Sequence, residues 1–361
     1  MQSQMRGLRA RAPFQTGASP SRVLVGRPKL RCQPRHVALA SAGDGMQVFS
    51  PSKINLFLRI MRRREDGYHD LASLFHVIDL GDDMALEVLP RGAGADVLVC
   101  SDPTIPCDER NLVIKALNLY RRKTGLDTRF RVTLDKRVPH GAGLGGGSGN
   151  AATTLWAANE LCGRPAGDRQ LLEWSGEIGS DISVFFSLGA AYCTGRGEVV
   201  EDVAPPLPLS TPLLLVKPPV GLSTPQIFKA LDLGRRSAAE PRGLLAGMAA
   251  EGRLSDELTV NDLEQPAFDT LPELAALRAR LEEAGDGAGR RYDSVFMTGS
   301  GSTIVCAGGE SPPAFLGGSG YEDVFVSPAR LIVRRPGEWY AAPAGGPRAS
   351  AAAAAAATAA A

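Results

Sequence analysis

The sequence lacks several features that would each point to a particular class of protein. No stretch approaches the roughly 18 uninterrupted apolar residues that a membrane-spanning helix needs, and its apolar runs, such as 213–216, have the length of a strand. The six cysteines include no Cys-x-x-Cys pair, and the four histidines do not cluster at metal-ligand spacing. We therefore expect no membrane span, no zinc site and no disulfide framework.

Acidic residues are absent from residues 1–43, which carry eight Arg or Lys. The rest of the chain has 32 Lys or Arg against 39 Asp or Glu, so its net charge is −7. A basic leader before an acidic body predicts an organelle transit peptide over 1–45. A nucleic-acid-binding arm is the alternative, but the acidic body offers no basic face that would extend such an arm. We therefore expect neither nucleic acid nor membrane among the partners.

The apolar pattern predicts a mixture of strands and helices, and the length predicts about two domains. Phe130, Val132 and Leu134 alternate with polar residues, which predicts a half-buried strand of an antiparallel sheet. The proline-rich stretch 204–212 is the best candidate for a domain boundary. We further expect a strand over 47–60 that is broken at Pro51, strands over 71–80, 213–216 and 294–297, a hairpin over 190–203, and helices over 111–122, 151–162, 171–177, 224–231 and 271–284.

Five glycines lie within 141–147, between the strand at 130–134 and the predicted helix at 151–162. Glycine lets the backbone approach a ligand closely and turn several N–H groups toward one point. The helix N-terminus that follows adds a partial positive charge. The segment therefore predicts a phosphate site. A flexible linker is the weaker interpretation, because linkers are not usually placed between an amphipathic strand and a strong helix.

The same loop matches G-x-G-x-x-G at Gly141, Gly143 and Gly146, the fingerprint of dinucleotide-binding folds. Such folds place a near-continuous apolar strand directly before the first glycine, whereas here the strand alternates and residues 136–139 intervene. No Gly-Lys-Ser or Gly-Lys-Thr closes the loop, so it is not a Walker A motif. An oxidoreductase that binds NAD remains the alternative from this fingerprint.

The segment 139–150, PHGAGLGGGSGN, resembles the ATP loop of the GHMP kinases, the galacto-, homoserine, mevalonate and phosphomevalonate kinases. Four more segments, PSKINLFL at 51–58, DGYH at 66–69, IGSDISVFF at 178–186 and TGSGST at 298–303, resemble the branch of that family that phosphorylates a cytidylated methylerythritol. That branch belongs to the non-mevalonate pathway of isoprenoid synthesis. One position departs from the family pattern, because Gly149 stands where the family commonly has serine.

The resemblance covers about residues 47–335 and implies a two-domain α+β fold. It implies a ribosomal protein S5 domain 2-like N-terminal domain over 46–207 and a ferredoxin-like C-terminal domain over 208–338. Separately, the alanine-, glycine- and proline-rich composition of the end of the chain predicts a disordered tail over 339–361. It also implies ATP and Mg²⁺ as cofactors, a plastid stroma location, and a monomer or weak homodimer.

The resemblance makes Asp181 the base that accepts the proton of the acceptor hydroxyl, with Lys53 beside it to orient that hydroxyl and stabilise negative charge. From the residues alone, Lys53 could instead face solvent on the polar side of its strand, and Asp181 could cap a helix. The implied ATP-binding residues are Pro139, Gly141, Gly143, Leu144, Gly145, Gly146, Gly147, Ser148 and Asn150. Mg²⁺ would be held through ATP, with Ser148 as a candidate contact, and the sequence does not reveal its side-chain ligands.

On the acceptor side, the resemblance makes Tyr68 and His69 contact the cytosine ring, with Phe228 stacked on its opposite face. Asn55 would hydrogen-bond the erythritol hydroxyls, and the second glycine turn, Gly299, Ser300 and Gly301, would line the site. Without the resemblance, Tyr68 could be a surface cap on the sheet. A mevalonate-type kinase, a related diphosphate decarboxylase and a catalytically silent nucleotide-binding regulator remain alternatives.

Overall fold

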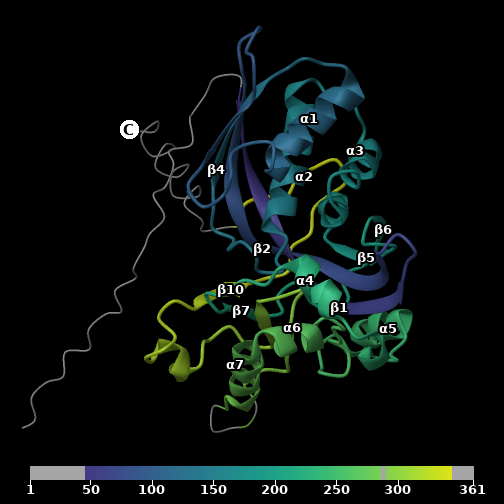
Figure 1. Cartoon of the computed structure of the whole chain (residues 1–361), viewed down its shortest axis with the longest axis vertical. Helices are drawn as coiled ribbons and strands as arrows, with labels where there is room; N and C mark the ends of the chain where they lie inside the picture. The colour runs from purple at the N-terminus through teal and green to yellow at the C-terminus, as the bar shows by residue number, and fades with distance from the viewer. Residues whose placement is uncertain (1–44, 286–288, 290, 344–361) are drawn as a thin grey trace, which may run out of the picture. The chain divides into compact units, whose positions relative to one another are not determined.

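The computed structural model describes residues 45–285, 289 and 291–343, and their first half builds a six-stranded sheet (Figure 1). The sheet has the order β3-β4-β2-β5-β6, and β1 pairs with β2 off this path. All neighbouring strands are antiparallel except β3 and β4, which are parallel. The strands are β1 (Gly45–Arg63), β2 (His69–Val88), β3 (Val97–Cys100), β4 (Phe130–Asp135), β5 (Ala190–Thr194) and β6 (Val199–Asp202).

The strands β1 and β2 form one long hairpin, which carries both Lys53 and the turn before Tyr68. Its register shifts between Pro51 and Ser52. The sequence predicted that Pro51 breaks this strand, but the strand is continuous. A β-bulge beside Pro51 accommodates its missing N–H.

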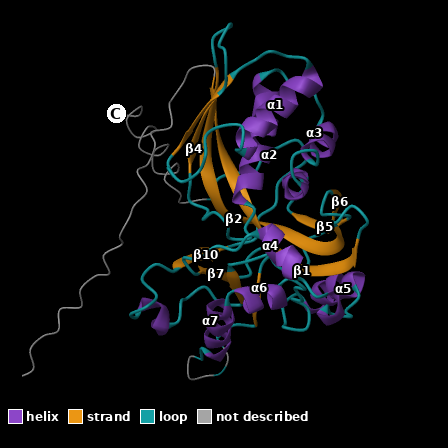
Figure 2. Ribbon diagram, viewed as in Figure 1, coloured by secondary structure: helices purple, strands orange, loops and turns teal. Residues whose placement is uncertain are grey.

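The strand β4 differs from the half-buried strand that the sequence predicted. Five of its six residues are buried, and Arg131 is the exposed one. The strand pairs with β2 on one edge and β3 on the other, and helices α1 (Leu112–Thr124) and α2 (Gly146–Leu161) pack beside this sheet (Figure 2). α3 (Asp168–Ser175) and the 3-10 helix η1 (Ser180–Phe186) follow α2.

The second half of the described chain builds a four-stranded antiparallel sheet in the order β10-β7-β9-β8. Its core joins the apolar side chains of these strands to those of α4, α6 and α7. The sequence did not predict β3, β9, β10, α5 or α6. The elements are β7 (Leu213–Lys217), α4 (Thr224–Ala230), η2 (Leu233–Arg235), α5 (Pro241–Glu251), α6 (Glu264–Thr270), α7 (Pro272–Glu283), β8 (Ser294–Met297), β9 (Ile304–Ala307), η3 (Ala314–Gly317) and β10 (Phe325–Ala329).

The last described segment returns to the first sheet, so the predicted division at 338/339 is wrong. The Ile332 N–H donates to the Val77 carbonyl at 3.0 Å. Trp339 stacks on Trp156 with ring centroids 5.3 Å apart, and Tyr340 is 3% exposed. These two aromatic rings pack into the core beside the first sheet, although the segment 339–361 was predicted to be disordered. The remainder of that tail, 344–361, and the predicted leader up to residue 44 lie outside the described residues.

Two simple features of the described part agree with the composition. No helix in it is long and apolar enough to cross a membrane. Its five cysteines are free, and two of them, Cys193 and Cys306, are buried.

Candidate active site

A cavity of about 1140 Å³ lies where β1, the glycine loop, α4 and the turn at 298–301 meet. Pockets for one small molecule usually measure roughly 300–1,000 Å³, so this cavity is larger than most such pockets. Every residue that the sequence placed in the site lines it except Gly301. The lining residues with predicted roles are Lys53, Asn55, Tyr68, His69, Pro139, Gly141, Gly143, Leu144, Gly145, Gly146, Gly147, Ser148, Asn150, Asp181, Phe228, Gly299 and Ser300.

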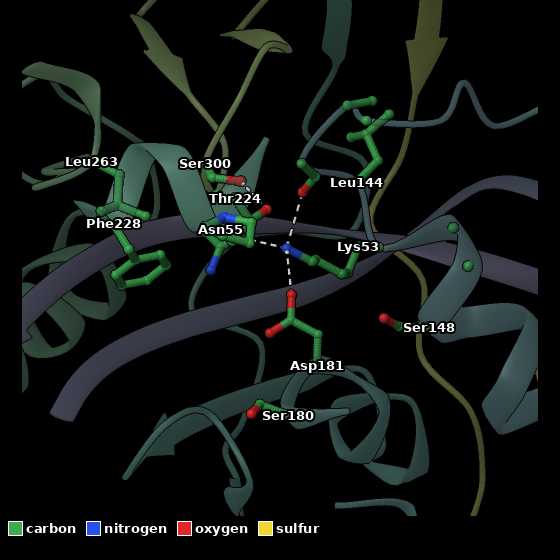
Figure 3. Close-up of a pocket in the computed structure, with 18 of the residues that line it drawn as sticks. Lys53, Asn55, Leu144, Ser148, Ser180, Asp181, Thr224, Phe228, Leu263 and Ser300 are labelled. Carbon is green, nitrogen blue, oxygen red and sulfur yellow. Dashed lines mark hydrogen bonds and ion pairs between the residues drawn. The ribbon is translucent and has the colours of Figure 1, made fainter. Parts of the chain in front are cut away.

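The ammonium of Lys53 lies at the centre of the site (Figure 3). It donates to Asn55 Oδ1 at 2.7 Å and to the Gly143 carbonyl at 2.9 Å, and its Nζ lies 3.4 Å from Asp181 Oδ2. A lysine has three N–H donors, so these partners account for all of them. The Lys53 side chain is 3% exposed, which excludes the solvent-facing alternative.

The Asp181 carboxylate is the open member of this ion pair, because its side chain is 43% exposed. Burial lowers the pKa of Lys53, and the charge of Asp181 opposes that shift by favouring the ammonium form. Asp181 does not cap its helix, since Gly179 is the N-cap of η1 and no side chain bonds there. The carboxylate therefore faces the cavity with its geometry set mainly by Lys53.

The glycine loop is pressed against β1 and against the second glycine turn. The backbone N–H of Lys53 donates to the Leu144 carbonyl at 2.9 Å. Gly143 has a φ of +74°, and a Cβ there would lie 2.3 Å from the Thr298 carbonyl oxygen. A Cβ at Gly149 would lie 2.3 Å from the Pro51 carbonyl oxygen. The glycine at 149, which departs from the family pattern, is therefore required by the close approach of α2 to β1.

The helix α2 begins at Gly146, earlier than the predicted Ala151, so its first turn is part of the loop. No side chain caps this end, and the first N–H groups of a helix have no partner within it. The Ser148 hydroxyl makes no hydrogen bond to another described residue. Uncapped N–H groups and a free hydroxyl at the wall of a cavity form a suitable anion site.

Two asparagines predicted to bind ligands instead hold the site together. Asn55 accepts from Lys53 and donates to Ser73 Oγ at 2.8 Å. Asn150 donates from Nδ2 to Ser50 Oγ and Asp82 Oδ2, both at 2.9 Å. Both Nδ2 donors of Asn150 have protein partners, which favours a supporting role, whereas Asn55 keeps one Nδ2 donor for a ligand.

The aromatic residues of the acceptor side lie differently from the predicted sandwich. The rings of His69 and Phe228 are 5.4 Å apart and tilted by 33°, which leaves no room for a base between them. Tyr68 is 57% exposed, and the Arg196 guanidinium lies 5.2 Å from its ring centroid. Burial and the charge of Arg63 lower the pKa of His69, so its imidazole is neutral at pH 7.

The second glycine turn is fixed from both sides of the cavity. The Asn55 N–H donates to Thr298 Oγ1, and the hydroxyls of Ser300 and Thr224 bond each other, both at 2.7 Å. The second bond ties the turn to α4, which carries Phe228. Gly301 does not line the cavity, contrary to prediction, because it faces Met297 and Leu222.

The sequence missed a charge pattern among the lining residues. Asp181 is the single acid among those residues, whereas six of them are lysine or arginine. These cations are scattered along the chain, so no local motif marks them. Such a lining favours ligands with several negative charges, such as polyphosphates. The cations are Lys53, Arg63, Arg110, Lys136, Arg196 and Lys229.

Comparisons with known proteins find relatives in one family of kinases. A family model for the GHMP kinases N terminal domain matches residues 111–189. The "4-diphosphocytidyl-2-C-methyl-D-erythritol kinase, chloroplastic/chromoplastic" of Solanum lycopersicum is 54% identical over 302 residues, which cover 83% of this chain and 74% of the relative. The chloroplastic enzyme of the same name from Arabidopsis thaliana is 52% identical over 300 residues, 83% of this chain and 77% of the relative.

Solved structures extend the likeness to the fold. A crystal structure of 4-(cytidine 5'-diphospho)-2C-methyl-D-erythritol kinase has a TM-score of 0.61 and 30% identity, and the match covers 79% of this chain and 99% of that one. A homoserine kinase from Cytophaga hutchinsonii has a TM-score of 0.62 at 17% identity, and covers 83% of this chain and 98% of that one. The second likeness concerns the fold alone.

Proposed function

Because the chain belongs to the 4-diphosphocytidyl-2-C-methyl-D-erythritol kinase family of the GHMP kinases, we propose that it phosphorylates the 2-hydroxyl of that cytidylated alcohol with ATP. The two-domain α+β fold of this family is confirmed. The reaction is a step of isoprenoid synthesis in the plastid. The observation that carries the proposal is the Asp181 carboxylate, which is open to the cavity and held by the buried Lys53.

The nucleotide would bind with its terminal phosphates at the first turn of α2. The N–H groups of Gly146, Gly147 and Ser148 and the partial positive charge of the helix end favour anionic oxygens. Ile105, Pro106, Leu112 and Leu134 line the same cavity and offer an apolar wall for the base. Binding at both ends would orient the terminal phosphoryl group toward Lys53 and Asp181, and positioning supplies much of the catalysis in phosphoryl transfer.

Asp181 would accept the proton of the attacking hydroxyl. Lys53 pairs with this carboxylate and donates to the Gly143 carbonyl, so one ammonium connects the base to the phosphate loop. As the oxygen attacks, the ammonium would also stabilise negative charge that develops nearby. The donors of Lys53 are occupied by protein, so it would orient the hydroxyl through Asp181 rather than by direct binding.

Mg²⁺ fits this site only as a partner of the nucleotide. The described residues contain no group of three His, Cys, Asp or Glu that could hold a metal ion. Mg²⁺ commonly binds through substrate phosphates with few protein ligands, and the free hydroxyl of Ser148 is suitably placed for this role. When bound, the ion would share the negative charge of the phosphates.

The cytidine end of the acceptor would bind beside Tyr68, His69 and Phe228. Since His69 and Phe228 already touch, a base would stack between Tyr68 and Phe228, after the Phe228 ring turns from His69. The neutral imidazole of His69 offers one donor and one acceptor to the edge of the base. Arg63, Arg196 and Lys229 would face the diphosphate.

An ADP-release assay with ATP, Mg²⁺ and the cytidylated alcohol tests the proposal, with mevalonate as the alternative acceptor. We expect turnover with the cytidylated alcohol and a product whose new phosphate is a monoester at the 2-position, identified by phosphorus NMR. Turnover with mevalonate alone, or none with either alcohol, would refute it. We also propose, on the resemblance to the family, a monomer or weak homodimer, and light scattering would measure its mass.

A further inference from the structure

The short helix that carries the proposed base is held at its far end by residues 334–340, here called the C-terminal segment. Asp181 lies in the first turn of η1 and faces Lys53 (Figure 3). The helix has seven residues, and no side chain caps its start. Helices of the 3-10 type have poor hydrogen-bond geometry, and short helices depend on tertiary contacts. The position of Asp181 therefore depends on what holds η1.

The side chain of Arg334 holds the carbonyl end of this helix. Its guanidinium donates to the carbonyl of Phe186, the last residue of η1, and to the Ser187 carbonyl at 2.8 Å. The Tyr340 hydroxyl donates to the same Ser187 carbonyl at 2.8 Å. The last carbonyls of a helix have no partner within it and carry partial negative charge, so a cation is favourable there. Two side chains of the C-terminal segment thus fix the end of η1.

The C-terminal segment is itself fixed to β1 and α2. The indole N–H of Trp339 donates to the Phe49 carbonyl on β1 at 3.0 Å, and its ring stacks on Trp156 of α2. The strand β1 also carries Lys53, the partner of Asp181. The segment therefore connects the helix of the carboxylate to the strand of the ammonium, by a route that does not pass through the cavity.

Stability alone does not favour an arginine at position 334. The Arg334 side chain is 3% exposed, and its Nη1 lies 3.9 Å from Asp168 Oδ2. A buried cation costs free energy to desolvate, and apolar side chains in place of buried charges are often neutral or stabilising. An arginine instead offers a planar fork of donors, which sets the positions of several oxygens at once. Here the fork meets the carbonyls that end the helix of the base.

We infer that Arg334 is a positioning residue for the proposed reaction, and that it acts through η1 on Asp181. The inference deepens the proposed function, on which it rests for the role of Asp181 as the base. Asp181 and Phe186 are five residues apart, about 10 Å along a 3-10 helix, so a shift of the carbonyl end moves the carboxylate against Lys53. Displacements of about 1 Å near reacting groups can cost roughly 100-fold in rate.

The test is a double-mutant cycle of Arg334→Met with Asp181→Asn, which compares single-turnover rate constants with ATP and the cytidylated alcohol. With Asp181 present, we expect Arg334→Met to lower the rate about 10- to 100-fold and to leave ATP affinity within about threefold by calorimetry. In the Asp181→Asn background we expect a loss of less than about threefold, because the base is already absent. If Arg334→Met does not fold, Arg334→Lys, which keeps the charge without the fork, replaces it with the same expectations.

Two results of the cycle would overturn the inference. An unchanged rate in Arg334→Met would mean that the packing of η1 alone fixes Asp181. An equal fold loss in both backgrounds would mean that Arg334 affects the reaction by some route other than the base.

The matched control is a buried arginine away from η1. Arg121 on α1 pairs with Asp96, and their side chains are 10% and 4% exposed. We expect Arg121→Met with Asp96→Asn to lower the melting temperature and to leave the single-turnover rate within about threefold. A rate loss as large as that of Arg334→Met would also refute the inference, because loss of any buried pair would then suffice.

A crystal structure of Arg334→Met separates this inference from the proposed function. We expect η1 to shift and the contact of Lys53 Nζ with Asp181 Oδ2, 3.4 Å in the wild type, to lengthen. A wild type that does not phosphorylate the cytidylated alcohol would refute the proposed function alone, and the structure of the variant would still test the position of Asp181. An unchanged contact in the variant, with normal turnover by the wild type, would refute the inference alone.

Discussion

The two halves of the cavity are built in different ways. The nucleotide half consists of backbone and glycine, fixed by side chains such as Lys53, Asn55 and Asn150 whose polar atoms are bonded within the protein. The acceptor half presents exposed or half-buried rings, and Tyr68 is 57% exposed. On the proposed function, the nucleotide half is formed before ATP binds, whereas the acceptor half must rearrange around the base. Asp181 lies where the two halves meet. Lys53 of the nucleotide half holds its carboxylate, which is open toward the acceptor half.

The largest expected effect comes from removing the group at that boundary. Asp181→Asn keeps the shape of the side chain but cannot accept the hydroxyl proton, and general bases contribute about 10²- to 10⁴-fold to rates. We expect kcat to fall about 1,000-fold and ATP affinity to stay within a few-fold, as measured by single-turnover kinetics and calorimetry. Glu173→Gln, an exposed acid on α3, is the control and should leave both unchanged. A kcat within tenfold of wild type would exclude Asp181 as the base.

The next effect tests whether the nucleotide half is rigid. Gly143→Ala places a Cβ 2.3 Å from the Thr298 carbonyl oxygen at a φ of +74°, so the two glycine turns must separate. Displacements of about 1 Å near reacting groups can cost roughly 100-fold in rate. We expect kcat/KM for ATP to fall about 100-fold in steady-state assays. The control is Gly147→Ala, whose Cβ would have Leu112 Cδ1 as its nearest neighbour at 3.8 Å. We expect this variant to change kcat/KM for ATP less than threefold. Equal effects at the two positions would argue against a rigid loop.

A smaller effect is expected from the ring of the acceptor half. Phe228→Ala removes one face of the proposed base site, and stacking contributes about 1–3 kcal/mol where bases are bound this way. We expect KM for the cytidylated alcohol to rise about tenfold or more, with KM for ATP unchanged. Phe315→Ala is the matched control. The Phe315 ring packs on Tyr321 with ring centroids 5.2 Å apart, but Phe315 does not line the cavity. A rise in both KM values for Phe228→Ala would mean that the two halves are not independent.

The same division explains what the sequence could and could not predict. The phosphate loop is a local feature, and five glycines between a strand and a helix mark it in one stretch of chain. The occupied amide of Asn150 depends on Ser50 and Asp82, which are far away in sequence and meet it only after folding. The contact of His69 with Phe228 joins β2 to α4 and is equally invisible to a local pattern.

The segment that begins at Trp339 shows the same limit of prediction from local sequence. Composition predicted disorder from residue 339, because the alanine, glycine and proline content dominates that end. Trp339 nevertheless donates to the Phe49 carbonyl at 3.0 Å and stacks on Trp156. The segment packs against a surface formed by β1 and α2, and no property of the segment itself reveals that surface.

The smallest expected effect comes from His76 on β2, the strand that supports both halves. It is an effect on stability and not on turnover. His76 is fully buried, its Nε2 has no hydrogen-bond partner among the described residues, and burial lowers its pKa to about 4. In the unfolded chain the pKa of a histidine is near 6.5. Between pH 4 and pH 6.5 the unfolded chain therefore binds a proton at His76 that the folded protein does not bind. Stability from this residue is therefore complete above about pH 6.5 and is lost as the pH falls toward 4.

Urea unfolding at pH 7 and pH 5 measures this loss. For wild type we expect His76 to contribute about 2 kcal/mol of the fall in the free energy of unfolding between the two pH values. His76→Gln, which does not titrate, should remove that part of the fall while kcat at pH 7 stays within twofold. If wild type and variant lose the same free energy between pH 7 and pH 5, His76 is not the buried group that makes the shared strand sensitive to acid.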